Sequence, residues 1–76
     1  MDNKVLGNLL RDCRLSKGLT QEVLSGLADI DESYLCKIES GLMNPTINLL
    51  YKLTDTMEVR LSDILRLAEE TENSKP

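Results

Sequence analysis

The feature that most constrains the fold of this chain is a pair of helix-start signals separated by a short break near its middle. Thr20 is expected to cap a helix over residues 21–28, and Asp31 to cap another that runs to about Ser40. Asp29 begins the break, and Asp tolerates the left-handed backbone of a tight turn better than most non-glycine residues. Two short helices joined this closely indicate a helix-turn-helix.

Another helix is expected before this pair. Leu6, Leu10 and Cys13 recur at helical spacing within residues 3–17, which places them on one apolar face. Gly18 follows as a stop signal, because glycine readily adopts the left-handed conformation that often ends a helix. Residues 3–17 are therefore predicted to form an amphipathic helix.

A fourth helix is expected after a loop. Gly41 ends the helix before the loop, and Pro45 biases Asn44 away from helical conformation. Thr46 is then placed to cap the next helix. The apolar face of that helix is predicted to hold Ile47, Leu50, Leu53, Thr54 and Met57.

A fifth helix and a polar tail complete the prediction. Ser62 is expected to be the N-cap of this helix, with Ile64 and Leu65 directed inward. The tail over residues 69–76 is polar and expected to fray. The sequence thus predicts an all-α fold, in which a compact five-helix domain over residues 1–68 carries a helix-turn-helix in its second and third helices.

The amino-acid composition narrows the functions that we expect for this chain. The chain is 41% hydrophobic with only two aromatic residues, which favours a packed helical core. It has no histidine, the residue most often used as a metal ligand or general base, and its two cysteines are expected to be free thiols. We therefore expect no enzyme activity, no cofactor and no bound metal. No stretch is long and apolar enough for a membrane span, and the chain starts without a signal-peptide pattern, so a cytoplasmic location is expected.

The charge is unevenly distributed along the chain. The net charge of −4 divides into +2 over residues 1–17, −4 over residues 18–48 and −2 over the remainder. The most acidic segment contains the helix-turn-helix. This is unfavourable for contact with a phosphate backbone, and any nucleic-acid function has to accommodate it.

Several short motifs at fixed spacing resemble one family. They are LTQEVL at residues 19–24, IESG at 38–41, NPT at 44–46 and VRLSDIL at 59–65, with Arg14 upstream. Together they resemble the lambdoid phage repressor and Cro-like (XRE-type) helix-turn-helix family over roughly residues 5–67. The resemblance implies a third helix that enters the major groove of double-stranded DNA and a homodimer that binds two half-sites. Stand-alone relatives of this size include restriction–modification controller proteins.

The resemblance also implies roles for individual residues. Three side chains match positions that contact base edges: Glu32, Ser33 and Lys37. Five match or neighbour positions that contact phosphates: Gln21, Tyr34, Ser40, Thr46 and Asn48. Arg14 and Glu39 match a structural pair, and the dimer candidates are Leu49, Tyr51, Leu61 and Leu65. Alternatives stay open for Glu32, which can instead favour the helix dipole, for Tyr34, which can pack on the second helix, and for Gln21 and Lys37, which can be plain exposed side chains.

The chain departs from the family pattern at four places. Asp29 stands where the turn usually has glycine, Ser25 replaces a small alanine, and Cys13 replaces a core leucine and is expected to be a buried, inert thiol. The largest departure is the apolar pair Leu42-Met43, where family members often carry basic residues. Each missing phosphate contact should lower the salt dependence of DNA binding by roughly 0.9 in logarithmic slope.

Two functions therefore follow from the sequence. The first is a sequence-specific transcriptional regulator, either a repressor or a controller protein, that binds palindromic DNA as a dimer. The alternative is a protein-interaction module of the same fold with weak DNA affinity. The acidic segment and a possible protein partner at Leu42 and Met43 favour this alternative.

Overall fold

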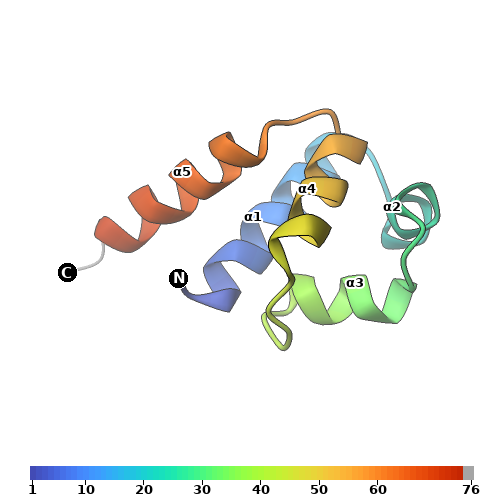
Figure 1. Ribbon diagram of the computed structural model, residues 1–76, viewed down its shortest axis with the longest axis horizontal. Coiled ribbons are helices and arrows are strands. Elements are labelled where there is room, and N and C mark those ends of the chain that lie inside the picture. Colours follow the sequence, from blue (N-terminus) through green and yellow to red (C-terminus); the bar gives the residue numbers. More distant parts are fainter. Residues whose placement is uncertain (75–76) are drawn as a thin grey trace.

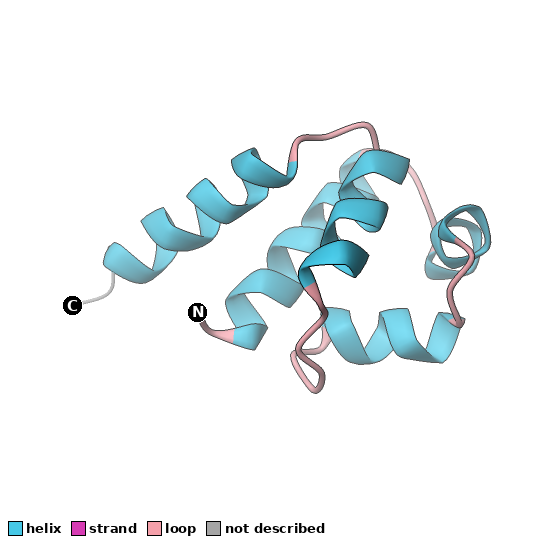
Figure 2. Ribbon diagram, in the orientation of Figure 1, coloured by secondary structure: helices cyan, strands magenta, loops and turns pink. Residues whose placement is uncertain are grey.

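The computed structural model describes residues 1–74, which form five α-helices and no strand (Figures 1 and 2). The helices are α1 (Asn3–Ser16), α2 (Gln21–Ala28), α3 (Glu32–Glu39), α4 (Ile47–Thr56) and α5 (Leu61–Asn73). This confirms the all-α, five-helix prediction, and α2 has the bounds that were predicted for it. In the described part of the chain, no helix combines the length and hydrophobicity needed to cross a membrane.

The helices begin largely at the side chains that the sequence indicated. The hydroxyl oxygens of Thr20 and Thr46 each accept a backbone N–H three residues further on, at 3.1 Å. Asp31 is the N-cap residue of α3, but its carboxylate accepts the hydroxyl proton of Ser33 at 2.6 Å and no backbone N–H. The position of this cap was predicted correctly, whereas its hydrogen bond was not.

Four of the helices end in the same way, with one residue in the left-handed conformation. These residues are Gly18, Asp29, Gly41 and Glu58, with φ values of 71°, 55°, 81° and 60°. After α2, the backbone N–H of Ile30 donates to the carbonyl of Ser25 at 2.9 Å, which closes the turn. Asp29 therefore takes the strained position expected for it. Glu58 does the same after α4 without a glycine signal.

The core is formed mainly by leucine and isoleucine side chains, and all five helices contribute to it. The buried hydrophobic residues are Leu6, Leu10, Leu24, Ala28, Leu35, Ile38, Leu50, Leu53, Met57, Ile64 and Ala68. Helix α1 packs against both α3 and α5, while α2 packs against α3 and α4. The inner side of the helix-turn-helix therefore packs against α1 and α4, while the side of α3 that faces away from them is exposed (Figure 1).

Helix α5 differs from its prediction at both ends. Arg60 is its N-cap residue, without a side-chain cap, and Ser62 lies inside the first turn. The carbonyl of Arg60 accepts the backbone N–H of Ile64 at 3.3 Å, so the helical hydrogen bonds begin two residues earlier than expected. At the other end, residues 69–73 are helical where a frayed tail was expected. Buried Ala68 anchors the helix, and the Glu72 carboxylate accepts the backbone N–H of Asp2. Residues 75–76 of the expected tail lie outside the described residues.

Two other predictions of burial need correction. Ile47 was placed on the apolar face of the fourth helix, yet its side chain is 59% exposed, because it is the first residue of α4 and lies beyond the edge of the core. Cys13 packs against the core but is only half-buried. Burial raises the pKa of the Cys13 thiol, and nearby Lys17 partly opposes that shift.

Candidate nucleic-acid interface

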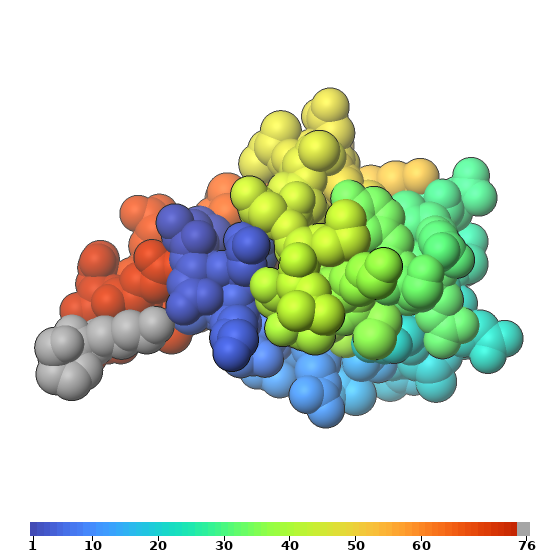
Figure 3. All heavy atoms as spheres, turned by 90° about the horizontal axis from the view of Figure 1, so that it is seen from below, coloured from blue at the N-terminus to red at the C-terminus, as the bar shows by residue number. Residues whose placement is uncertain are grey.

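Helix α3 has two chemically distinct faces. Leu35, Ile38 and Glu39 are buried against the rest of the domain. The exposed residues of the helix and its C-cap are Glu32, Ser33, Cys36, Lys37 and Ser40. We call these five residues the α3 face. Figure 3 shows the molecule from the side on which α3 and the α3–α4 loop lie at the surface.

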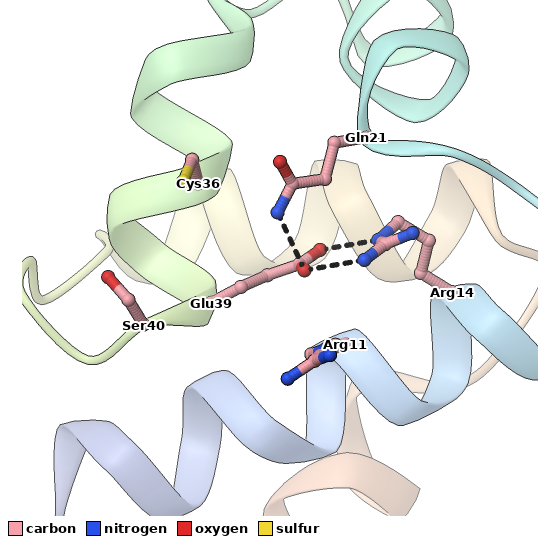
Figure 4. Close-up of a pocket in the computed structure, with 6 residues that line it drawn as sticks. All are labelled: Arg11, Arg14, Gln21, Cys36, Glu39 and Ser40. Carbon is pink, nitrogen blue, oxygen red and sulfur yellow. Dashed lines mark hydrogen bonds and ion pairs between the residues drawn. The ribbon is translucent and has the colours of Figure 1, made fainter.

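A buried ion pair fixes the C-terminal end of α3 against α1. The Arg14 Nε donates to Glu39 Oε2 at 2.8 Å, and Arg14 Nη2 donates to Oε1 at 2.9 Å (Figure 4). The third guanidinium nitrogen donates to the carbonyl of Leu19 at 2.8 Å. This hydrogen bonding to Glu39 raises the pKa of Arg14. The structural pair was predicted from the resemblance, and its geometry is the bidentate form that constrains both partners.

Gly7 allows α1 and α3 to approach closely enough for that ion pair. A Cβ atom at this position would lie 2.5 Å from the carbonyl oxygen of Ile38 and 2.6 Å from that of Glu39. Any side chain would therefore push the two helices apart. Sequence reasoning did not single out this residue, although a glycine between buried Leu6 and Leu10 in a helix interior is a signal of close packing.

The three base-contact candidates lie together on the α3 face. Glu32, Ser33 and Lys37 are all exposed, and within the described residues the Lys37 ammonium has no hydrogen bond or ion pair. Sequence reasoning missed Cys36 as a member of this surface. It lies four residues after Glu32, so the same helical spacing that grouped the other three could have identified it.

The five phosphate-contact candidates fall into different environments. Thr46, Ser40 and Asn48 are exposed, although the Thr46 hydroxyl also caps α4 and the Ser40 hydroxyl donates to the Lys37 carbonyl at 3.1 Å. Gln21 is half-buried, and its amide nitrogen donates to Glu39 at 3.1 Å. Gln21 therefore belongs to the hydrogen-bond network that holds α3 in place, and its alternative interpretation as a plain exposed side chain is wrong.

Tyr34 lies at the edge of the α3 face. It is half-buried and packs against the hydrophobic core, which is the environment of its alternative interpretation as a packing residue. The preceding residue, Ser33, is exposed and the following one, Leu35, is buried, so Tyr34 lies between the exposed and the buried side of the helix. A role in phosphate binding remains a prediction for this residue.

A shallow pocket of about 210 Å³ lies where α1, α2 and α3 meet (Figure 4). Its lining residues are Arg11, Arg14, Gln21, Cys36, Glu39 and Ser40. Arg14 and Glu39 neutralise each other there. Arg11 is exposed and, among the described residues, makes no hydrogen bond or ion pair, so it contributes an uncompensated positive charge to the edge of the α3 face.

The loop after α3 is only partly exposed. Leu42 is 77% exposed, while Met43 packs against the core, so the two residues do not form the shared apolar surface that was expected of them. The loop turns at Gly41, where a Cβ atom would lie 2.7 Å from the Lys4 Cγ. The beginning of α1 therefore lies beside this loop, as Figure 3 also shows.

Comparison with known proteins agrees with this geometry. A family model described as helix-turn-helix matches residues 10–64. The chain belongs to the helix-turn-helix family. It is 32% identical over 68 residues to an uncharacterised HTH-type transcriptional regulator from Sinorhizobium fredii, covering 90% of this chain and 88% of that protein. It is also 34% identical to the HTH-type transcriptional regulator SlrR from Bacillus subtilis, over 79% of this chain but only 40% of that longer protein.

The fold also matches a solved structure. The restriction-modification controller protein C.AhdI from Aeromonas hydrophila superimposes with a TM-score of 0.80 at 32% identity, over 83% of this chain and 96% of that one. This agreement extends over almost the whole controller protein. It confirms the resemblance that the motifs indicated.

Proposed function

We propose that this chain is a cytoplasmic, non-enzymatic transcriptional regulator that binds palindromic double-stranded DNA as a homodimer. The observation that carries the proposal is the contrast between the two sides of α3. One side is fixed by a buried bidentate ion pair, and the other presents exposed hydrogen-bonding side chains at helical spacing. A rigid helix with a free polar face is what major-groove recognition needs.

The α3 face offers suitable chemistry for base recognition. Lys37 can donate to the O6 and N7 atoms of guanine, and Glu32 can accept from the N4 amino group of cytosine. The Ser33 hydroxyl donates its proton to the Asp31 carboxylate, which orients it, and its oxygen can accept a hydrogen bond from a base. Around this face, we assign phosphate contacts to Gln21, Ser40, Thr46 and Asn48.

The homodimer would use the outer surfaces of α4 and α5. Tyr51 is 62% exposed and remains the strongest dimer candidate. Leu49 and Leu61 already pack against their own core and offer less surface, and Leu65 is half-buried. A symmetric dimer on DNA places its two half-sites about one helical turn apart. The similarity to a controller protein supports this arrangement.

Selection of bound sequences from a random pool of duplex DNA tests the proposal. We expect a palindromic consensus whose half-sites are about one helical turn apart, and affinity that falls as salt concentration rises. Failure to bind any duplex at about 50 mM salt, with no salt dependence, would contradict it. A consensus without two-fold symmetry would contradict the dimer alone.

One observation favours the alternative function, a protein-interaction module. Leu42 is a large apolar side chain that is 77% exposed beside the α3 face. If this residue binds a protein partner, then Leu42→Ser should abolish that partner's binding and leave DNA binding unchanged. If the residue contacts DNA instead, the same substitution should weaken DNA binding directly.

A further inference from the structure

The proposed DNA-binding surface has fewer cations than its function needs. Residues 18–48 carry a charge of −4, and within them Lys37 is the only basic residue. The loop after α3 has exposed Leu42 where a basic side chain would meet a phosphate. Neutralising phosphates and releasing their counterions supplies most sequence-independent affinity for DNA. Positive charge must therefore reach this surface from another element.

Helix α1 brings that charge to the edge of the α3 face. Arg11 lines the pocket of about 210 Å³ together with Cys36 and Ser40, which belong to the α3 face. The other arginine of the pocket, Arg14, uses its Nε and both terminal nitrogens for Glu39 and the carbonyl of Leu19. Within the described residues, Arg11 has neither an ion pair nor a hydrogen bond, so its guanidinium is available to a ligand (Figure 4).

Lys4 occupies a corresponding position at the start of α1. It precedes Arg11 by seven residues, or about two helical turns, so both side chains project from the same side of the helix. The Lys4 stem lies against Gly41, at the loop where basic residues are absent. The exposed polar residue between them on this side, Asn8, carries no opposing charge.

We propose that Arg11 binds a backbone phosphate of the DNA, and that α1, through Arg11 and secondarily Lys4, replaces the cations that the α3–α4 loop lacks. This inference rests on the proposed function and identifies which residues provide its electrostatic affinity. The pocket also contains Gln21, and its one carboxylate, that of Glu39, is already paired with Arg14. The Gln21 amide nitrogen has a second N–H beyond the one that it donates to Glu39, so a phosphate oxygen placed there would meet a cation and a neutral donor together. The +2 charge of residues 1–17 would then offset half of the −4 charge of residues 18–48.

The test compares the salt dependence of binding to a random-sequence duplex, measured by fluorescence anisotropy between about 50 and about 200 mM salt. Arg11→Gln should reduce the slope of log affinity against log salt by roughly 0.9. Arg11→Lys keeps the charge and should keep the slope. Arg66→Gln is the matched control, since Arg66 is an exposed arginine of α5 that already pairs with Asp63, and it should leave the slope unchanged.

The outcomes separate this inference from the function on which it rests. If the unmodified protein binds with a salt slope that Arg11→Gln leaves intact, the assignment of Arg11 is wrong while DNA binding stands. If Arg66→Gln lowers the slope as much as Arg11→Gln, the effect reflects net charge alone, and the assignment is again overturned. If the unmodified protein does not bind DNA at any salt concentration, both proposals fail. Circular dichroism of each variant establishes that the fold is retained.

Discussion

The two faces of α3 differ in how many contacts their side chains make with the rest of the domain. On the buried face, Glu39 accepts hydrogen bonds from Arg14 and Gln21, and its position depends on the close approach of α1 at Gly7. On the exposed face, Glu32 and Lys37 make no such contacts among the described residues. The fold thus specifies one side of the helix in detail and leaves the other side free to vary. Substitutions on the exposed face should therefore change stability much less than those on the buried face.

The largest expected effect comes from removing the buried charge at the C-terminal end of α3. Glu39→Ala would leave Arg14 buried without a partner, and breaking such a pair typically costs about 3–5 kcal/mol. For a domain of this size, that lowers the melting temperature by at least about 12 °C. Thermal unfolding followed by circular dichroism measures the change.

A double variant shows whether the stability is lost because a buried charge has no partner or because packing is lost. Arg14→Met with Glu39→Leu removes both charges and replaces them with apolar volume, so it should recover much of the stability lost by Glu39→Ala. If Glu39→Ala costs less than about 1 kcal/mol, the pair does not hold α3 in place, and the contrast between the two faces is weaker than we infer.

Gly7→Ala should also disturb the buried face, by a smaller amount. The added methyl group meets backbone carbonyls of α3, which cannot move aside as a side chain can, so we expect a loss of about 1–3 kcal/mol. Gly26→Ala is the matched control in α2, where an added Cβ meets nothing within 4 Å. That substitution should stabilise the helix by roughly 0.5–1 kcal/mol. Urea denaturation of both variants gives the comparison, and equal effects would contradict the close approach of α1 and α3.

On the exposed face, Lys37→Ala should separate recognition from stability. Surface substitutions of this kind usually change folding free energy by no more than about 0.5 kcal/mol. The loss should instead appear as about 1–3 kcal/mol of discrimination at one base pair of the selected site. Competition binding with single-base variants of that site measures it. Uniform weakening across all sequences would make Lys37 a phosphate contact.

The features of the fold that could be predicted from sequence are those encoded within a few residues. Thr20 starts α2 and Asp29 ends it through hydrogen bonds that span at most five residues, so local signals were sufficient. The end of α5 was missed because its contact joins Glu72 to Asp2, 70 residues away. The start of the same helix was missed because no capping side chain marks it, since its N-cap residue, Arg60, makes no side-chain hydrogen bond to the helix.

The same reasoning explains which parts of the candidate site were found. The residues Glu32, Ser33 and Lys37 lie on one helix, so the motif and its spacing located them together. Arg11 is a member of the site only because α1 packs across α3, and no spacing along the chain reveals that. Residues that are brought together by packing between separate helices can be identified only from the three-dimensional structure.

The smallest expected effect is a difference in reactivity between the two cysteines, one half-buried and one exposed. Cys36 is exposed on the α3 face, whereas Cys13 is half-buried and its pKa is raised by burial, so less of it is thiolate near neutral pH. Iodoacetamide should therefore alkylate Cys36 several times faster, as measured by mass spectrometry of the peptides. Bound DNA should slow the reaction of Cys36 and leave that of Cys13 unchanged. If DNA protects neither thiol, then the α3 face is not the surface that meets the major groove.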